Sequence, residues 1–322
     1  MAQIPLDRLV TVYGGSGFVG RHLVRALAKR GWRIRVAVRR PDLCHHLQPL
    51  GVVGQVHAVQ ANLRYPDSVA RAAEGAEAIV NLVGILHASG AQTFDAVQAK
   101  GAAAVAQAAQ DCGARLVQMS AIGADRSSEA EYGRTKSAGE EAARAARAEA
   151  IVIRPSIVFG PEDDFFNRFA SLARMSPVLP LIGGGETKFQ PVFVGDVALA
   201  IVKAVEGEAK PGTTYELGGP EIKSFRELME ITLRQIGRKR LLIPLPFGVA
   251  RVQAALMELM PNPMLTRDQV KMLGYDNVVS EAAIREGRTL EGLGIVPTAM
   301  ESVLASYLWR FRKAGQFTRP AA

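Results

Sequence analysis

The chain has 322 residues, of which 48% are hydrophobic and 22% are charged, so it can bury a sizeable core as one large domain or two ordinary ones. Its 39 Lys and Arg residues against 31 Asp and Glu residues give a formal charge of +8, which suits phosphate-bearing ligands, anionic lipid or an acidic protein partner without choosing among them. The two cysteines, Cys44 and Cys112, exclude a disulfide framework and a multi-thiolate metal site, and they favour a reducing compartment.

The start of the chain, MAQIPLDRLVTVYGG, shows no secretion signal, and no apolar run reaches the length of a membrane-spanning helix. We therefore expect a cytoplasmic protein whose contact with a membrane is at most peripheral. The basic residues are scattered and form no recognised binding module, so we expect no nucleic-acid partner.

In the first half of the chain, short β-branched runs alternate with Ala-rich helical stretches, the pattern of strands and crossover helices in a parallel sheet. The expected strands are Leu9–Tyr13, Arg33–Val38, Val56–Gln60, Ala78–Leu82, Arg115–Met119 and Ala150–Arg154. Helices are expected between them over Gly20–Arg30, Ser68–Ala73, Thr93–Asp111 and Tyr132–Ala148. The sequence thus predicts an α/β fold with a doubly wound parallel sheet of the Rossmann type.

After Gly160 this alternation breaks down, because Pro and Gly become frequent, as in SPVLPLIGGG. We expect a first domain over residues 1–160 and a smaller, mostly helical lobe over residues 161–322. The segment Gln190–Val202 is typical of a return to the sheet, which would be completed by about residues 190–220. The two parts would then be interleaved along the chain.

A glycine-rich turn, LVTVYGGSGFVG, joins the first expected strand to the first expected helix. Gly14 allows a tight turn, Gly17 lets the backbone approach a diphosphate, and Gly20 lets helix and strand pack closely. The diphosphate would lie at the helix N-terminus, where free N–H groups and the helix dipole favour negative charge. This turn predicts a dinucleotide site that contains Gly14, Gly17, Phe18, Val19 and Gly20.

The second strand, RIRVAV, ends in Arg39 and Arg40, at the position where an acidic side chain would bind the 2′-hydroxyl of NAD. Guanidinium groups match a 2′-phosphate instead, through charge-assisted forked hydrogen bonds. The pair therefore favours NADPH over NADH. The alternative is that both arginines only solvate the end of a strand.

Three polar residues are expected to form a reactive group. Ser120 ends the strand RLVQM, and Tyr132 and Lys136 follow at i and i+4 on one helix face. A nearby cation lowers the pKa of a phenol, so Tyr132 could transfer a proton while Ser120 holds a carbonyl or hydroxyl oxygen. Lys136 could also bind the nicotinamide ribose. A Tyr and a Lys at this spacing also arise by chance, but their order after the glycine turn favours the functional interpretation.

With GGSGFVG, Ser120, Tyr132, Lys136 and RPSIVFGP, the chain resembles the extended short-chain dehydrogenase/reductase superfamily. VQANLRYPDSV, NLVGIL, RPSIVFGPEDDFFNRFA and PLIGGGETKFQPVFVGDVA make it resemble, more closely, the atypical branch containing the nucleotide-binding accessory subunit of respiratory complex I. The resemblance implies further cofactor contacts near the adenine, the ribose and the nicotinamide, respectively: Asn62 and Leu63; Val83 and Gly84; and Pro155, Ile157 and Val158. An aspartate is more common than Asn62 in the wider superfamily.

The resemblance also implies a function. Family members hold NADPH tightly as a structural element, so we expect an accessory or assembly protein of a respiratory NADH:quinone oxidoreductase, with complex I subunits as partners. Because Ser120, Tyr132 and Lys136 are retained, an NADPH-dependent oxidoreductase or epimerase is the alternative, and a role in quinone biosynthesis is a third.

The C-terminal segment TAMESVLASYLWRFRKAGQF combines apolar and aromatic residues with Arg310, Arg312 and Lys313. This mixture suits a helix lying on an anionic membrane, at the cytoplasmic face of the inner membrane, and the stretch VARVQAALMELM could join it. A helix packed on its own domain with a solvated basic end has the same pattern. We expect no metal site: Cys44, His45 and His46 lack a distant ligand, and PEDDFF is interpreted as a solvated loop.

Overall fold

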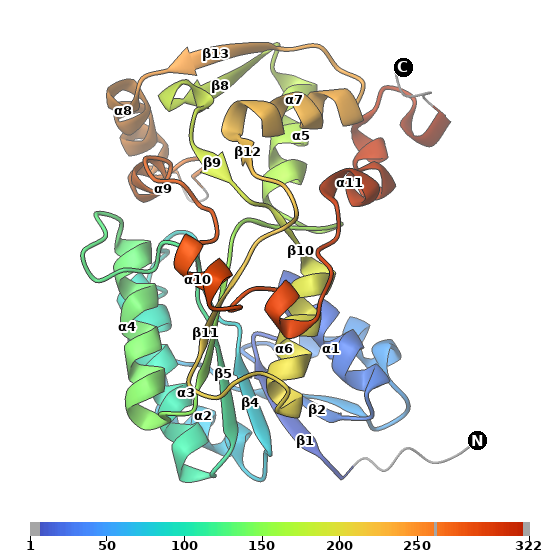
Figure 1. Ribbon diagram of the computed structural model, residues 1–322, viewed down its shortest axis with the longest axis vertical. Helices are drawn as coiled ribbons and strands as arrows, with labels where there is room; N and C mark the ends of the chain where they lie inside the picture. The colour runs from blue at the N-terminus through green and yellow to red at the C-terminus, as the bar shows by residue number, and fades with distance from the viewer. Residues whose placement is uncertain (1–6, 261–262, 318–322) are drawn as a thin grey trace. The chain divides into compact units, whose positions relative to one another are not determined.

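The structure is a computed structural model that describes residues 7–260 and 263–317 (Figure 1). The chain forms two compact units, each assembled from separate stretches of sequence. Unit 1 comprises Met1–Arg154, Gly195–Leu217 and Glu281–Ile295. Unit 2 comprises Pro155–Val194, Gly218–Ser280 and Val296–Ala322.

Unit 1 contains a seven-stranded sheet in the order β11-β6-β5-β4-β1-β2-β3. Neighbouring strands from β3 to β6 run parallel. The order β3-β2-β1-β4-β5-β6 is that of a doubly wound dinucleotide-binding sheet, so the predicted Rossmann-type fold is confirmed. The strands are β1 (Leu9–Tyr13), β2 (Arg33–Val38), β3 (Val56–Gln60), β4 (Ala78–Asn81), β5 (Arg115–Met119), β6 (Ile151–Pro155) and β11 (Thr214–Leu217).

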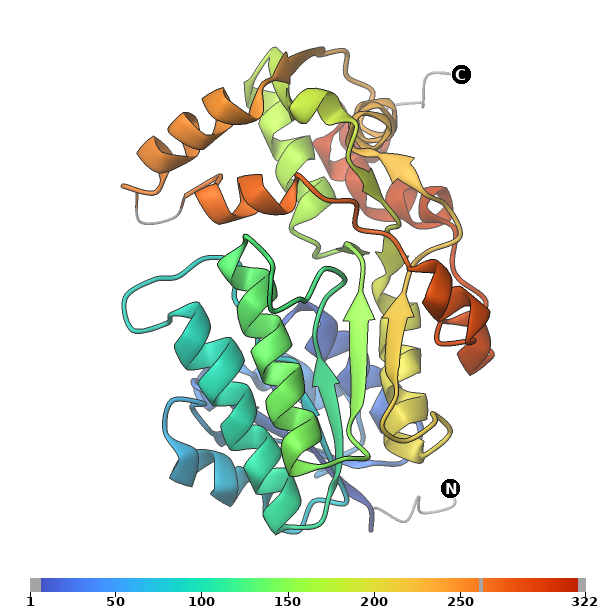
Figure 2. The ribbon, with the colours of Figure 1, turned by 60° about the vertical axis from the view of Figure 1, so that its left-hand side comes forward.

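Helices cover both faces of this sheet, as the two views of the ribbon show (Figures 1 and 2). One face carries α2 (Pro66–Ala73), α3 (Lys100–Asp111) and α4 (Glu131–Ala146), whose buried alanines and valines pack against Ile79 and Leu116 of the strands. The other carries α1 (Phe18–Lys29) and α6 (Val194–Glu206), and the short helix α10 (Glu281–Arg285) also belongs to unit 1. The carboxyl ends of the parallel strands therefore lie at one edge between two helical layers.

Most expected elements are present within one or two residues of their predicted bounds. The expected helix Thr93–Asp111 begins differently, with a π-helical segment over Asp95–Ala99 that continues into α3. The chain returns to unit 1 at Gly195, and β11 completes the sheet within residues 190–220, as expected. Gln190–Val202 itself adds no strand to the large sheet: it contains the two-residue strand β10 (Val192–Phe193), which pairs elsewhere, and the start of α6. Helix α6 is buried on nearly every side, and such an apolar run cannot be told from a strand by periodicity.

Unit 2 is built around an aromatic and aliphatic core that includes Phe159, Phe166, Phe225 and Leu304. Its helices are α5 (Phe165–Met175), α7 (Phe225–Gln235), α8 (Phe247–Met257), α9 (Arg267–Met272) and α11 (Met300–Leu308). Its strands form three two-stranded pairs: β8 (Val178–Ile182) with β13 (Leu241–Leu245), β7 (Val158–Phe159) with β10, and β9 (Lys188–Phe189) with β12 (Lys223–Ser224). Within the described residues no helix is long and apolar enough to cross a membrane.

Asp163 ties the C-terminal helix of unit 2 to the start of α5. Its side chain is 2% exposed, accepts hydrogen bonds from the backbone N–H groups of Gly160, Phe166 and Asn167, and accepts a further one from the Tyr307 hydroxyl. The interpretation of PEDDFF as a solvated loop is therefore wrong for Asp163. Burial raises the pKa of this carboxyl, and the Tyr307 hydrogen bond opposes that rise. The contact fixes α11 on its own unit.

We expect Tyr307→Phe to lower the free energy of unfolding of unit 2 by about 1.5–3 kcal/mol, the usual contribution of a hydrogen bond to a charged group. The loss should shrink as pH falls and the Asp163 carboxyl is protonated, and the raised pKa of this carboxyl places that change above the usual range of an aspartate. Urea unfolding monitored by tryptophan fluorescence measures it. Tyr275→Phe, at a tyrosine that is 57% exposed in the same unit, is the matched control. Equal unfolding midpoints for the two variants at pH 7 would contradict this role of Tyr307.

Candidate dinucleotide site

The glycine-rich turn follows β1 at the point where the strand order reverses, since β1 lies between β2 and β4. Gly14 has a φ of +77°, and Gly17 donates its N–H to the Gly14 carbonyl at 3.0 Å. A Cβ on Gly20 would lie 2.6 Å from the Gly14 oxygen and from the Gly15 backbone, so only glycine fits at this close approach. Open sheets of this kind bind ligands in the crevice at the carboxyl ends of their strands, at such a switch point.

Helix α1 begins directly in this turn. Gly17 is its N-cap, with no side-chain cap, and its first turn carries no acidic residue. The N–H groups of Phe18, Val19 and Gly20 belong to the first turn, where a helix has no internal acceptors, so they fit the role of anion donors. The predicted diphosphate-binding residues thus lie on one turn, whose backbone fits the group.

The turn is fixed to residues that come from the neighbouring strands. Gly14 donates its N–H to Ala37 near the end of β2 at 3.1 Å, and a Cβ on Gly14 would lie 3.1 Å from the Val83 side chain. Gly84 follows, where a Cβ would lie 3.0 Å from the Lys136 Nζ atom. The structure therefore brings Gly14, Val83, Gly84 and Lys136 together.

Ser120, Tyr132 and Lys136 lie in the same unit. Ser120 follows β5, is 3% exposed, and has an Oγ atom without a hydrogen-bond partner among the described residues. Lys136 is 5% exposed; its Nζ donates to the Met119 carbonyl at 3.4 Å and lies 5.8 Å from the centre of the Tyr132 ring. A buried hydroxyl with no acceptor or donor in the protein is what a site for a substrate or cofactor oxygen requires.

The expected lowering of the Tyr132 pKa is not what the structure shows. Burial raises the pKa of the Tyr132 phenol to about 12. Burial also lowers the pKa of the Lys136 ammonium to about 8, against the opposing charge of Glu140. Removal of each group from water favours its neutral form, and this outweighs the attraction between phenolate and ammonium.

The two arginines after β2 differ in their surroundings. Arg40 is exposed and paired with Asp42, to which it donates from Nε at 3.0 Å and from its terminal nitrogen at 2.7 Å. This pairing raises the pKa of Arg40 and lowers that of Asp42. Arg39 is also exposed but makes no hydrogen bond or ion pair with any residue that the structure describes. Of the predicted pair, Arg39 is the guanidinium available to a ligand.

The other residues predicted to contact the cofactor lie in different surroundings. Asn62 uses its side-chain oxygen to accept the Arg64 N–H at 3.2 Å, and Leu63 is 8% exposed in the core beside Gly101. Pro155, Ile157 and Val158 belong to unit 2, where Ile157 accepts a backbone hydrogen bond from Val192. Their contacts with a cofactor stay predictions.

Sequence reasoning missed the buried amides that hold the site. Asn81 ends β4; it donates to the Gln118 side chain at 3.0 Å and accepts the Val83 N–H at 3.1 Å. Gln98, in the π-helical segment, donates to the Ile85 carbonyl at 2.7 Å and accepts from Thr135, which lies on α4 beside Lys136. All three amides are at most 3% exposed. The only signal in the sequence that could have identified these amides is that each is a polar residue inside an otherwise apolar run.

Within the described residues no group of three His, Cys, Asp or Glu side chains could hold a metal ion.

Comparison with known proteins identifies the family. The model described as "NAD dependent epimerase/dehydratase family" matches residues 10–218. The chain belongs to this family.

The relatives of this chain include a subunit of a respiratory enzyme and a reductase. The chain is 35% identical over 320 residues to "NADH dehydrogenase [ubiquinone] 1 alpha subcomplex subunit 9, mitochondrial" from Arabidopsis thaliana, an alignment covering 95% of this chain and 79% of the relative. It is 35% identical over 245 residues to "Ceramide reductase" from Caulobacter vibrioides, covering 74% of each. The resemblance to the accessory-subunit family of complex I is thereby confirmed.

A solved structure shares the fold of this chain. A dTDP-glucose 4,6-dehydratase from Streptomyces venezuelae, solved with NAD bound, superposes with a TM-score of 0.72 over 94% of this chain and 96% of its own, at 22% identity. At that identity the likeness concerns the fold alone.

Proposed function

We propose that this chain is an NADP(H)-binding accessory or assembly protein of a respiratory NADH:quinone oxidoreductase, and that the dinucleotide is a structural element. One observation carries this proposal: the similarity to the plant complex I subunit extends over 95% of the chain, through unit 2, whereas the ceramide reductase matches 74%. Identity of 35% through both units indicates a closer relationship than the fold alone, which the dehydratase shares over 94% of this chain at 22% identity.

The preference for NADPH over NADH rests on Arg39. The backbone bond from Gly14 to Ala37 holds the end of β2 beside the diphosphate turn, and Arg39 follows that strand end directly. Its exposed guanidinium is unpaired among the described residues, and the adenosine 2′-phosphate is an anion that it can bind through forked, charge-assisted hydrogen bonds. Arg40 is already neutralised by Asp42.

We expect Arg39→Ala to weaken NADPH binding about 10- to 100-fold, since hydrogen bonds to a charged group contribute about 1.5–3 kcal/mol. NADH affinity should change little, because NADH lacks the phosphate. Arg40→Ala is the matched control and should leave both affinities within about threefold, as surface pairs contribute little. Isothermal titration calorimetry with both dinucleotides measures these values. An equal loss for NADPH and NADH, or a larger effect at Arg40, refutes the assignment.

A second candidate function is favoured by the orphan hydroxyl of Ser120. Such a group fits a substrate carbonyl, with Tyr132 as proton donor and Lys136 beside it. The relative named ceramide reductase points to a long-chain lipid carbonyl as the substrate class. When bound, the nicotinamide would supply the hydride; the residues of this chain would bind and orient the carbonyl and deliver its proton.

If this candidate is correct, Tyr132→Phe lowers kcat/KM for NADPH-dependent carbonyl reduction at least about 100-fold, because general acid catalysis contributes about 10²–10⁴. The hydroxyl is lost while the ring contact with Phe94 remains, so NADPH affinity should persist. Oxidation of NADPH, monitored by absorbance with ceramide-type carbonyl substrates, is the assay. Absence of turnover in the unmodified protein across such a panel leaves the structural role of the cofactor as the function.

For the location, we propose peripheral attachment to the cytoplasmic face of the inner membrane. The C-terminal tail offers fewer side chains to a membrane than its sequence indicates. Tyr307 and Phe311 are buried, and Arg310 and Arg312 donate hydrogen bonds to acceptors within unit 2. Trp309 and Phe317 are its exposed rings, at 37% and 84%.

The face of α8 fits a lipid surface better. It presents apolar side chains that are between 48% and 83% exposed and lie on one side of the helix and its C-terminal extension: Val249, Val252, Leu256, Leu259 and Met260. The opposite side is buried through Ala250 and Ala254. Arg251 on the same helix is exposed and carries a positive charge, which favours an anionic surface. We propose that this α8 face inserts at the headgroup level.

We expect the tagged chain to sediment with native membranes and to copurify with quinone reductase subunits in gentle detergent. Val252→Ser with Leu256→Ser should shift it to the soluble fraction at least about tenfold, since each buried Val or Leu side chain contributes about 1.5–3 kcal/mol. NADPH affinity should be unchanged, because Val252 and Leu256 are not among the predicted cofactor contacts. Val296→Ser, at a valine that is 87% exposed, is the control. A soluble chain that brings down no other subunit contradicts the accessory role.

A further inference from the structure

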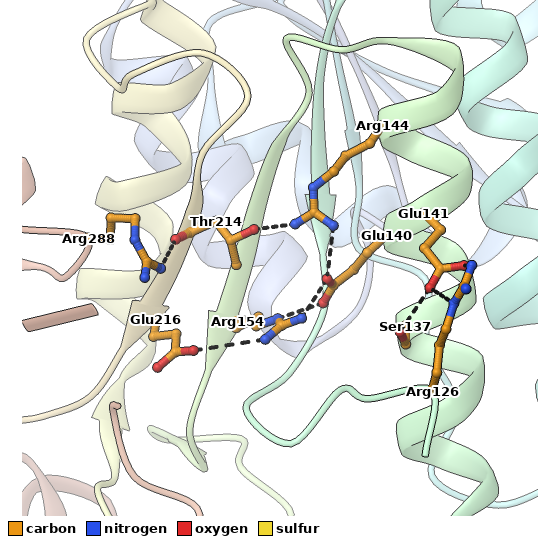
Figure 3. A network of polar contacts seen from close by, with 9 residues as sticks. All are labelled: Arg126, Ser137, Glu140, Glu141, Arg144, Arg154, Thr214, Glu216 and Arg288. Carbon is orange, nitrogen blue, oxygen red and sulfur yellow. Dashed lines mark hydrogen bonds and ion pairs between the residues drawn. The ribbon is translucent and has the colours of Figure 1, made fainter. Parts of the chain in front are cut away.

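A buried carboxylate lies one helical turn beyond Lys136 and plays no part in the site described above. Glu140 on α4 is 1% exposed and accepts two hydrogen bonds from Arg154 of β6, from Nε and from a terminal nitrogen, both at 2.7 Å (Figure 3). The forked geometry matches guanidinium to carboxylate and fixes both side chains. Helix α4 is thereby joined to the sheet at the level of its reactive residues.

Further contacts extend this pair across unit 1 (Figure 3). Arg154 also lies 3.9 Å from Glu216 of β11, and Arg144, one turn along α4, lies 3.6 Å from Glu140. Arg144 donates to the Thr214 hydroxyl. The carboxylate thus receives cations from its own helix and from β6, and these are in turn held by β11.

Such a network is weak evidence for stability. Removing two charges from water costs several kcal/mol for each ion, and packed hydrophobic residues in place of a buried ion pair are often neutral or stabilising. The position of Glu140 supplies another reason for its charge. Tyr132, Lys136 and Glu140 are spaced i, i+4 and i+8, so the three lie on one face of α4.

Glu140 follows the buried Lys136 by four residues on the same face of α4, and its charge favours the ammonium form. Burial alone lowers the pKa of Lys136, and the Glu140 charge acts in the other direction. Other charged groups on the elements that pack against α4 are already engaged or distant: Asp95 and Lys100 pair with each other at the surface at 2.7 Å, and Arg115 begins β5 at the far end from Met119. Arg154 is the cation that Glu140 itself holds.

We propose that Glu140, held in place by Arg154 one helical turn beyond Lys136, is a positioning residue that keeps the Lys136 ammonium charged beside the dinucleotide ribose, and so sets the upper pH limit of NADP(H) binding. This inference rests on the proposed function, in which Lys136 contacts the bound cofactor. Because a protonated Lys136 donates to the ligand and a neutral one donates less strongly, affinity is full below the pKa of Lys136 and declines as pH rises through it.

The test is the pH profile of the NADPH dissociation constant between pH 5 and 10. We expect the unmodified protein to lose affinity with a midpoint near the Lys136 pKa of about 8. Glu140→Gln removes the charge at nearly constant shape and should lower this midpoint by about one to two pH units. Arg154→Met removes the competing cation while Arg144 still faces Glu140, so the midpoint should rise.

Opposite shifts in the two variants separate positioning from a structural role. Loss of a merely structural pair would weaken binding at every pH in both variants and leave the midpoint unchanged. Glu140→Asp retains the charge and should restore the midpoint, which keeps the proposal testable if Glu140→Gln does not fold. Lys136→Met should remove the pH dependence and so identify the titrating group.

Two failures are distinguishable. If the unmodified protein binds no NADPH at any pH, the proposed function fails. If it binds NADPH but Glu140→Gln and Arg154→Met shift the midpoint in the same direction or not at all, the role of Glu140 is overturned and the dinucleotide site stands.

Discussion

The close approach of helix α1 to the end of β1 is the constraint on which unit 1 depends. At Gly20 the helix backbone touches the turn itself, since any Cβ there would lie 2.6 Å from backbone atoms of Gly14 and Gly15. The same turn is bonded sideways to Ala37 of β2, and Tyr13 accepts the Leu82 N–H that follows β4. One backbone conformation therefore sets the helix N-terminus, the start of the Arg39 segment and the start of the Val83 segment together. The features of a dinucleotide site follow from this geometry more than from any single side chain.

Much of this arrangement could be predicted from the sequence because parallel strands are buried on both faces and appear as uninterrupted apolar runs. LVTVY and RLVQM have the bounds predicted for them, and the glycine spacing indicated the turn between β1 and α1. The same reasoning failed at Val194–Glu206. This stretch is a largely buried helix, and its charged residues Asp196, Lys203 and Glu206 recur at helical spacing but are few among alanines and valines. Local pattern identifies an element best when a whole face meets water, and it loses that power when most of the surface is covered.

The residues of the candidate site likewise fall into those that the sequence predicted and those that it did not. Gly14, Val83, Gly84 and Lys136 were named from separate motifs, and the structure brings them into contact. Asn81, Gln98 and Gln118 were not named, because a lone amide in an apolar run has no spacing to interpret. Their role becomes visible only when their partners, which lie far away in the sequence, are known. The pKa of Tyr132 shows a related limit: a neighbouring cation could be inferred from i and i+4 spacing, but the depth of burial that outweighs it could not.

Ser120 and Lys136 differ in which function of the site they support, cofactor storage or catalysis. A protein that only stores a dinucleotide has a use for Lys136, because an ammonium can hold a ribose hydroxyl whether or not hydride is transferred. It has less use for Ser120. A buried hydroxyl without a partner costs about 1–3 kcal/mol, and an alanine of nearly the same size would avoid that cost. Among the described residues Ser120 has no such partner, and an oxygen that arrives with a ligand would supply one. The serine, more than the tyrosine and lysine, is therefore the residue whose chemistry separates a storage site from a catalytic one.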